Sequence, residues 1–124
     1  MKSKNNHLFG MLKKKSQKRV EEEIESELRG KIERIFEEKK KKLRIDATLD
    51  LRFIDDIPII GENVYGEAFP FERPPRIWLE VFAPDARTAE IIEHICHELI
   101  HIQHPEPGEE EKEFKRRIRE CIKN

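Results

Sequence analysis

The hydrophobic period of the chain changes once, near residue 44, from a helical to a strand-like spacing. Residues 16–43 place apolar side chains at steps of three and four: Val20, Ile24, Leu28, Ile32, Ile35 and Phe36. That spacing puts them on one face of a helix, with charged residues on the other faces. From Ile45 to Phe53 apolar and polar residues alternate, which is typical of a strand with one buried face.

Further strands are expected beyond residue 53. Short strands are predicted at 57–60 and 64–69, inside a stretch that is rich in proline and glycine, and a clearer strand is predicted at 77–82. With the strand at 45–53 they would form a small mixed sheet of three to four strands.

Two helices are expected to close the chain. Thr88 is a good N-cap for a helix over 89–103, and Pro105 would prevent that helix from continuing. A last helix should begin near Glu109 with an acidic first turn and end near Ile122. The order of one helix, several strands and two helices predicts an α+β fold.

The length and charge of the chain indicate one domain with a basic extension. The chain has 124 residues, which suits a single domain over 16–124. Residues 1–15 are polar and basic, and we expect them to form a flexible extension. The net charge of −1 argues against a nucleic-acid-binding protein. The basic run 39–42 is interpreted as a solvated helix face.

A cytoplasmic chain is the expectation from the remaining composition. No apolar run is long enough to span a membrane, and no apolar signal segment follows the basic N-terminus. The two cysteines, Cys96 and Cys121, lie far apart in the sequence. Reduced thiols are the default in that compartment, and a disulfide between the two stays open.

The motif His97-Glu98-Leu99-Ile100-His101 points to a metal centre. Residues four apart share a helix face, so His97 and His101 can bind one zinc ion together. Glu98 borders the same face, where it can act as general base on a water that the zinc activates. Four of the five histidines of the chain lie along this stripe. This spacing predicts a zinc site with peptidase chemistry.

A catalytic zinc needs a third protein ligand, for which the spacing leaves several candidates. His104 follows His101 by three residues on the same stripe. The other candidates are four glutamates at the start of the last helix: Glu109, Glu110, Glu111 and Glu113. Helical spacing puts Glu111 nearest the apolar face of that helix and Glu113 on its flank, so spacing alone does not choose between them.

With its HExxH helix and the glutamate-rich helix after it, the chain resembles the minigluzincins. These are small soluble archaeal zinc metallopeptidases similar to the catalytic core of a family of integral-membrane peptidases. The resemblance implies a zincin-like domain with a backing helix, a zinc ion held by two histidines and one glutamate, and endopeptidase activity on a peptide or protein substrate. It also implies an edge strand that binds extended substrate, for which Trp78 to Phe82 is the candidate.

The resemblance further implies a ligand, a latent state and self-association. The ligand glutamate of that pattern precedes an aromatic residue, which favours Glu113 before Phe114, with Glu111 second. Members tend to be isolated as zymogen-like forms, and homodimers or larger assemblies are common. Residues 1–15, with Phe9 and Leu12, are the candidate segment that blocks the cleft. The alternative is a non-catalytic metal-binding or partner-binding module on the same fold.

Overall fold

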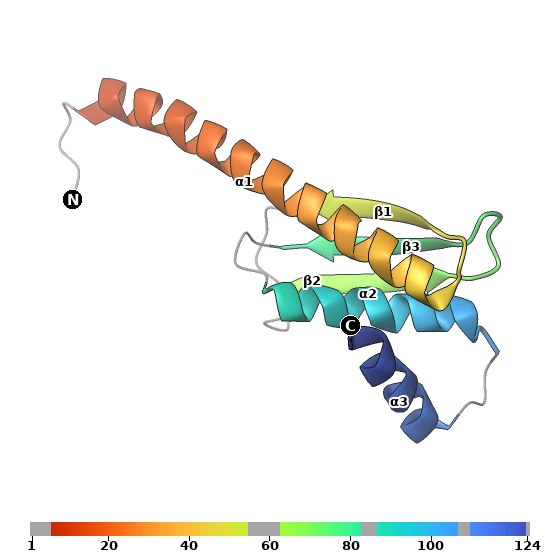
Figure 1. The fold of residues 1–124 in the computed structure, drawn as a ribbon. Coiled ribbons are helices and arrows are strands. Elements are labelled where there is room, and N and C mark those ends of the chain that lie inside the picture. The colour runs from red at the N-terminus through yellow and green to blue at the C-terminus, as the bar shows by residue number, and fades with distance from the viewer. Residues whose placement is uncertain (1–5, 55–62, 83–86, 107–109, 124) are drawn as a thin grey trace.

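The chain folds into three helices and a three-stranded mixed sheet, which confirms the predicted α+β class (Figure 1). The computed structural model describes residues 6–54, 63–82, 87–106 and 110–123, with the backbone alone for 6–22 and 24. The elements run in the order α1 (Asn6–Leu43), β1 (Thr48–Phe53), β2 (Val64–Phe69), β3 (Arg76–Val81), α2 (Thr88–Gln103) and α3 (Glu111–Ile122).

Some boundaries differ from those that the sequence predicts, among them the starts of α1 and α2. Helix α1 begins at Asn6, so most of the range expected as a flexible extension is helical. Thr88 is the first residue of α2, and Arg87 takes the N-cap position without a side-chain cap hydrogen bond. The strand predicted at 57–60 lies outside the described residues. No helix in the described part of the chain is long and apolar enough to cross a membrane.

The sheet has the order β1-β3-β2, which corrects the prediction of the substrate-binding edge strand. Strand β3 pairs parallel with β1 and antiparallel with β2, so it is the central strand. The segment from Trp78 to Phe82, predicted as the substrate-binding edge strand, therefore already has a partner on each side. The edge strand beside α2 is β2 (Figure 1). Alternating hydrophobicity assigns residues to the faces of a sheet but does not say which strands are neighbours.

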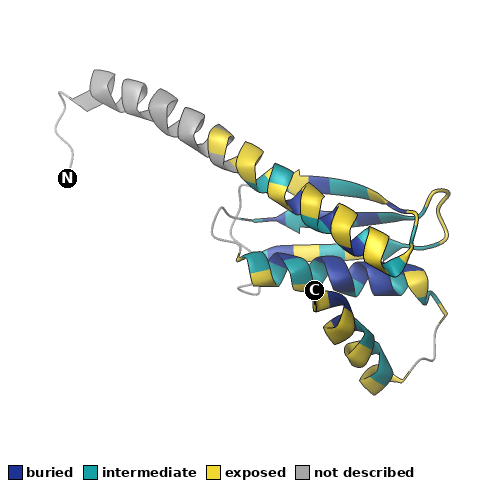
Figure 2. Cartoon of the chain, in the orientation of Figure 1, coloured by how far each residue is buried: buried dark blue, intermediate teal, exposed yellow. Residues whose placement is uncertain are grey.

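Helices α1 and α2 pack together on one face of the sheet. Ile32 and Phe36 of α1 share a buried cluster with Leu79 of β3 and with Ile95 and Leu99 of α2. Figure 2 shows this buried layer where the two helices meet the strands. Burial of such apolar side chains is the main stabilising term for a domain of this size.

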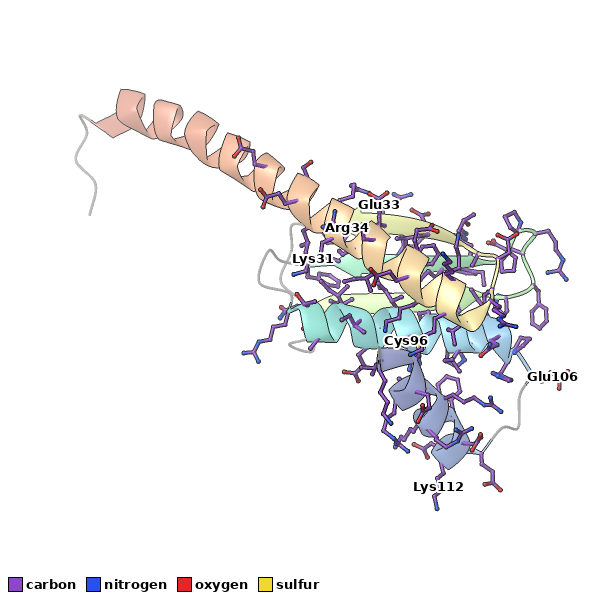
Figure 3. All side chains as sticks on the ribbon, in the orientation of Figure 1. Lys31, Glu33, Arg34, Cys96, Glu106 and Lys112 are labelled. Carbon is purple, nitrogen blue, oxygen red and sulfur yellow. A yellow bond between two sulfur atoms is a disulfide. The ribbon has the colours of Figure 1, made fainter. Side chains whose placement is uncertain are left out.

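Helix α3 packs on the opposite side of α2 through a smaller cluster. Its buried members are Cys96, Ile100, Ile118 and Cys121. A disulfide joins Cys96 to Cys121, so the expectation of two reduced thiols was wrong. Figure 3 labels Cys96 on α2, above α3. The pairing was hard to foresee because the two cysteines are separated by 25 residues and meet only through the packing of the two helices.

The end of α1 is attached to the end of α3 by lysine side chains. The Lys39 ammonium group donates to the carbonyl of Ile122, and the Lys42 ammonium group donates to the carbonyl of Glu120 at 2.7 Å. Lys39 is buried, with 4% of its surface exposed. The expectation that the run 39–42 is a solvated face was therefore wrong for Lys39. Cations at this end of α3 also complement its helix dipole.

Candidate metal centre

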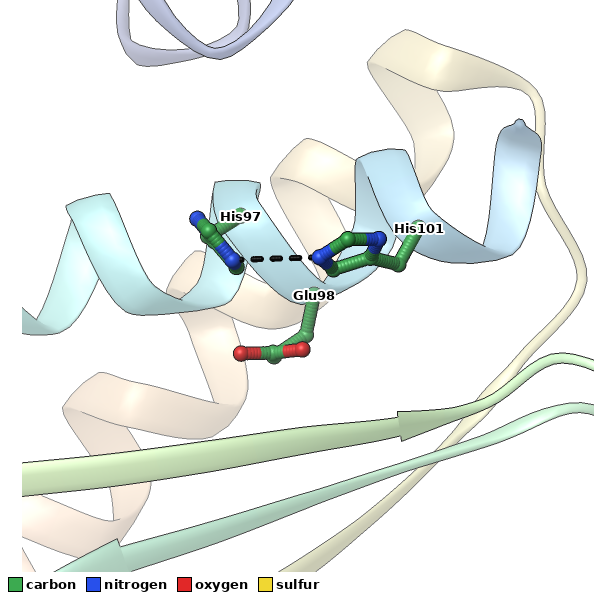
Figure 4. A group of neighbouring side chains, drawn as sticks. All are labelled: His97, Glu98 and His101. Atoms are coloured by element: carbon green, nitrogen blue, oxygen red, sulfur yellow. Dashed lines mark hydrogen bonds between the residues drawn. The ribbon is translucent and has the colours of Figure 1, made fainter. Parts of the chain in front are cut away.

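Helix α2 brings His97, Glu98 and His101 together at one site (Figure 4). One ligand atom from each residue can be chosen so that all lie within 4.8 Å of one another. The Nε2 atoms of His97 and His101 are 3.1 Å apart and share a hydrogen bond, in which one ring donates and the other accepts. The four-residue spacing produces this arrangement, because it places both imidazoles on one helix face, one turn apart. The group can hold a metal ion.

Both imidazoles are in an environment that favours the neutral form. Burial lowers the pKa of His97, and the neighbouring His101 and His94 lower it further. Burial also lowers the pKa of His101. A metal binds the neutral imidazole, so this environment keeps both rings ready to coordinate at neutral pH.

Glu98 is a buried carboxyl group that has no hydrogen-bond partner among the described residues. Only 6% of its surface is exposed, and its carboxylate lies between α2 and the sheet (Figure 4). Burial raises the pKa of Glu98 to about 7, and the charge of Glu67 contributes to that rise. A carboxyl group with a pKa near neutrality can both accept and return a proton at physiological pH.

Strand β2 approaches Glu98 closely at Gly66. A Cβ atom at this position would lie 3.0 Å from both Cγ and Oε2 of Glu98, closer than side chains normally pack. The absence of a side chain at residue 66 therefore leaves space for the Glu98 carboxylate. Sequence reasoning did not assign Gly66 to the site, although a glycine inside a strand is a known signal of close approach by another group.

An open groove runs between β2 and α2, with Gly66, His97 and Glu98 in its middle. A hollow of about 370 Å³ lies toward the C-terminal end of β2, where Glu67, Ala68, Pro70, His101 and Pro105 complete its lining. A second hollow of about 240 Å³ lies on the other side, where Tyr65, Glu93 and His94 complete the lining. The metal-binding group is thus reachable from both ends of the groove.

Helix α3 adds an aromatic ring to the group but not a carboxylate. The Phe114 ring centroid lies 4.5 Å from that of His101 and 5.2 Å from that of His97. Glu113 accepts a hydrogen bond at 3.0 Å from Arg116, which lowers the pKa of Glu113. Glu113, the favoured third ligand, therefore lies outside the group of His97, Glu98 and His101.

The other candidates for the third ligand are also outside the group. Glu111 pairs with Lys115 at 3.1 Å, and 82% of the Glu111 side chain is exposed. His104 is the C-cap residue of α2. Glu110 is the exposed N-cap residue of α3, and Glu109 lies outside the described residues. Over the described ranges only His97, Glu98 and His101 form a group that could hold a metal.

No family model matches this chain, and neither the curated proteins nor the solved structures compared with it give a match. The resemblance to the minigluzincins therefore rests on the HExxH helix and the glutamate-rich helix alone. What the protein does has to be inferred from the geometry of the site.

Proposed function

We propose that the protein is a zinc-dependent endopeptidase and that the state described above is its latent form. One observation carries this proposal: two imidazoles face each other at 3.1 Å beside a buried carboxyl group that has no hydrogen-bond partner among the described residues. A structural zinc site is usually closed and rich in cysteine, whereas this group borders an open groove.

The spacing of the two imidazole nitrogens supports zinc as the metal. Zinc binds histidine nitrogen at about 2.0–2.1 Å in a tetrahedral arrangement, which separates two ligand atoms by roughly 3.3 Å. The observed 3.1 Å between the two Nε2 atoms is close to that value. Nitrogen donors from histidine also suit zinc better than they suit magnesium or calcium.

The chemistry follows from the position of Glu98. When bound, zinc would supply Lewis-acid activation of a water molecule and of a peptide carbonyl. Glu98 would take the proton of the water and deliver it to the leaving amine, a role for which its position beside the two imidazoles suits it. Its burial in the groove also strengthens its interaction with charge that develops in the transition state.

The free edge of β2 supports a peptide as the substrate. An edge strand has unpaired backbone N–H and C=O groups that can pair with an extended peptide. Within the described residues β2 pairs with β3 on one side only, and its other side borders the groove that holds Glu98. A peptide bound along β2 would pass beside His97 and His101.

We propose Glu113 as the third ligand and its pairing with Arg116 as the basis of latency. The adjacent residue Phe114 already contacts both imidazoles, so Glu113 is one residue from the site. Binding metal would require the Glu113 carboxylate to leave Arg116 and Phe114 to leave the imidazoles. The N-terminal segment with Phe9 and Leu12 has no described side chains, so its blocking role stays a prediction.

The test combines metal analysis with cleavage of a quenched peptide library by the full chain. We expect one zinc ion per wild-type chain. Glu98→Gln should retain the zinc and lose cleavage by at least about 100-fold, because it removes the general base. His97→Ala should lose both zinc and cleavage.

A matched control is Glu37→Gln, which changes an exposed carboxylate of α1 outside the groove. It should retain zinc and still cleave at least some library members. Zinc binding without any cleavage, even after Arg116→Ala, would favour the non-catalytic module. Wild-type protein that binds no zinc, or cleavage that survives Glu98→Gln, would contradict the proposal.

A further inference from the structure

The groove has a carboxylate on each side of the metal-binding group. Glu67 lines the hollow toward the C-terminal end of β2, and Glu93 lines the hollow on the other side. Both are exposed at the surface. No lysine or arginine lines either hollow within the part of the chain that the structure describes. The two ends of the groove therefore share a negative charge.

Glu98, in the middle of the groove, has no lysine or arginine bonded to it among the described residues. Glu98 is 94% buried, since 6% of its surface is exposed, and it points into both hollows without a hydrogen-bond partner among the described residues. The negative charge of the groove also affects Tyr65 at its edge: the pKa of Tyr65 is raised, and the charge of Glu67 is the main cause. The nearby cation on the sheet, Arg76, is bonded to Glu72 at 2.8 Å; that bond is the main cause of the raised pKa of Arg76, and the charge of Glu67 contributes to it.

The lining of each hollow suits a long cationic side chain. Ala68, Pro70 and Pro105 give the larger hollow an apolar wall beside Glu67, which can contact the methylene stem of lysine or arginine. In the smaller hollow Glu93 is accompanied by Tyr65, an aromatic residue whose hydroxyl donates to Glu67 at 3.5 Å. An aromatic ring next to a carboxylate binds guanidinium through its face and its charge together.

We propose that the groove selects peptides that carry lysine or arginine side chains, with Glu67 and Glu93 as the specificity-determining residues at its two ends. This inference rests on the proposed peptidase function for its biological meaning. The selection itself is a property of binding, so it can be measured without turnover.

The experiment measures peptide binding to the zinc-loaded full chain in the Glu98→Gln background. One peptide is a neutral alanine-based sequence with an arginine on each side of its centre and a neutral fluorophore. The comparison peptide replaces both arginines with citrulline, which has a similar shape and no charge. By fluorescence anisotropy, the arginine peptide should bind at least about fivefold more tightly, the size expected for exposed ion pairs. The advantage should shrink as salt is raised.

Variants then assign the selection to the two acids. Glu67→Gln and Glu93→Gln should each reduce the advantage, and the double variant should abolish it. Glu37→Gln is the matched control, because Glu37 is an exposed carboxylate on α1 that pairs with Lys40. That variant removes the same charge outside the groove and should keep the advantage.

Three results would overturn the inference: no binding of the arginine peptide, equal binding of both peptides, or an advantage that survives in the double variant. Its failure is separable from that of the proposed function. Zinc-dependent cleavage without charge preference would leave the peptidase standing and remove the selection. Charge-selective binding by a chain that never cleaves would leave the selection standing and remove the peptidase proposal.

Discussion

At the scale of single residues, the contact between Gly66 and Glu98 is the most sensitive point of the site. A Cβ atom on residue 66 would lie 3.0 Å from the Glu98 carboxylate. Gly66→Ala should therefore displace the carboxylate and lower the cleavage rate by about 10- to 100-fold, since small misplacements of catalytic groups are costly. Zinc content should not change, because the two histidines are not touched.

The control for that substitution is Gly30→Ala, which makes the same change on α1. The added Cβ atom would meet only an ordinary contact at 3.6 Å from Arg34, so cleavage should stay within about threefold of wild type. Equal rates for Gly66→Ala and wild type would show that the carboxylate position does not matter.

The raised pKa of Glu98 predicts a pH-dependent stability in the metal-free protein. Between its ordinary value of 4.5 and its folded value of about 7, folded Glu98 keeps a proton that the unfolded chain has lost. The contribution of Glu98 protonation to the free energy of unfolding is therefore fully present below pH 4.5 and is lost as the pH rises to 7. Glu98→Gln mimics the protonated form, so its stability relative to wild type should rise across this window by up to about 3 kcal/mol.

Urea denaturation at pH 4 and pH 8, with a chelator present, measures the difference. The lowered pKa values of His97 and His101 affect both proteins alike, so the comparison isolates Glu98. A relative stability of the variant that does not change with pH would contradict the assignment of a raised pKa to Glu98.

The sequence predicted the site residues that belong to one helix and missed those that come from elsewhere. His97, Glu98 and His101 follow from local spacing, which a helix converts directly into proximity. Gly66 and Glu67 reach the site only because β2 lies beside α2, a contact between distant parts of the chain. The position of Glu113 depends on its arginine neighbours in three dimensions, which helical spacing does not resolve.

At the scale of elements, α3 is attached chiefly by a small cluster that includes the disulfide. Cys96 and Cys121 are both fully buried and lie 25 residues apart in the chain. Closing a loop of that length stabilises the folded state by about 3 kcal/mol in the chain-entropy account. The double variant Cys96→Ala/Cys121→Ala should lose about that much stability in urea denaturation.

Hydrogen exchange distinguishes a local effect from a global one. In the double variant, amides of α3 should lose protection before those of β3, since the larger cluster between α1, α2 and the sheet does not include the cysteines. Addition of a reductant should destabilise wild type and leave the double variant unchanged. A wild type that is insensitive to reductant would contradict a disulfide in solution.

The lysines of α1 give a second prediction at this scale. Lys39 is buried and donates to the carbonyl of Ile122, which the end of α3 leaves without an intrahelical partner. Lys39→Met should keep the packing of the stem, lose this bond and cost about 1 kcal/mol of unfolding free energy. Lys41→Met is the control, because Lys41 is exposed on the same helix and should be neutral.

The elements themselves were predictable where local signals agreed. The predicted limits of α2 differ from the observed ones by one residue, since its apolar period is regular and a proline follows its end. Strand β3 was predicted from its alternation but placed at the edge of the sheet instead of its centre. Strand order depends on which non-local pairings bury the most apolar surface, and no local pattern carries that information.

At the scale of the whole molecule, α2 lies between two packing units. One of its faces belongs to the larger cluster with α1 and the sheet, and the other to the smaller cluster with α3. The histidines lie between these faces, at the border of the groove. The position of α3 therefore determines what surrounds the imidazoles, and a metal ion that recruits a ligand from α3 would link both units.

This arrangement predicts that zinc affinity depends on the pair between Glu113 and Arg116. Arg116 donates to the Glu113 carboxylate at 3.0 Å and Arg117 lies 3.6 Å from it, so both compete with the metal for that group, Arg116 more strongly. Arg116→Ala should tighten zinc binding by about fivefold, in line with the strength of exposed ion pairs, and Glu113→Gln should weaken it by more than that. Arg119→Ala is the matched control, because Arg119 is an exposed arginine of the same helix. Competition with a zinc-binding dye measures all three; if Glu113→Gln binds zinc as tightly as wild type, another group completes the site, and Glu111→Gln is the next variant to measure.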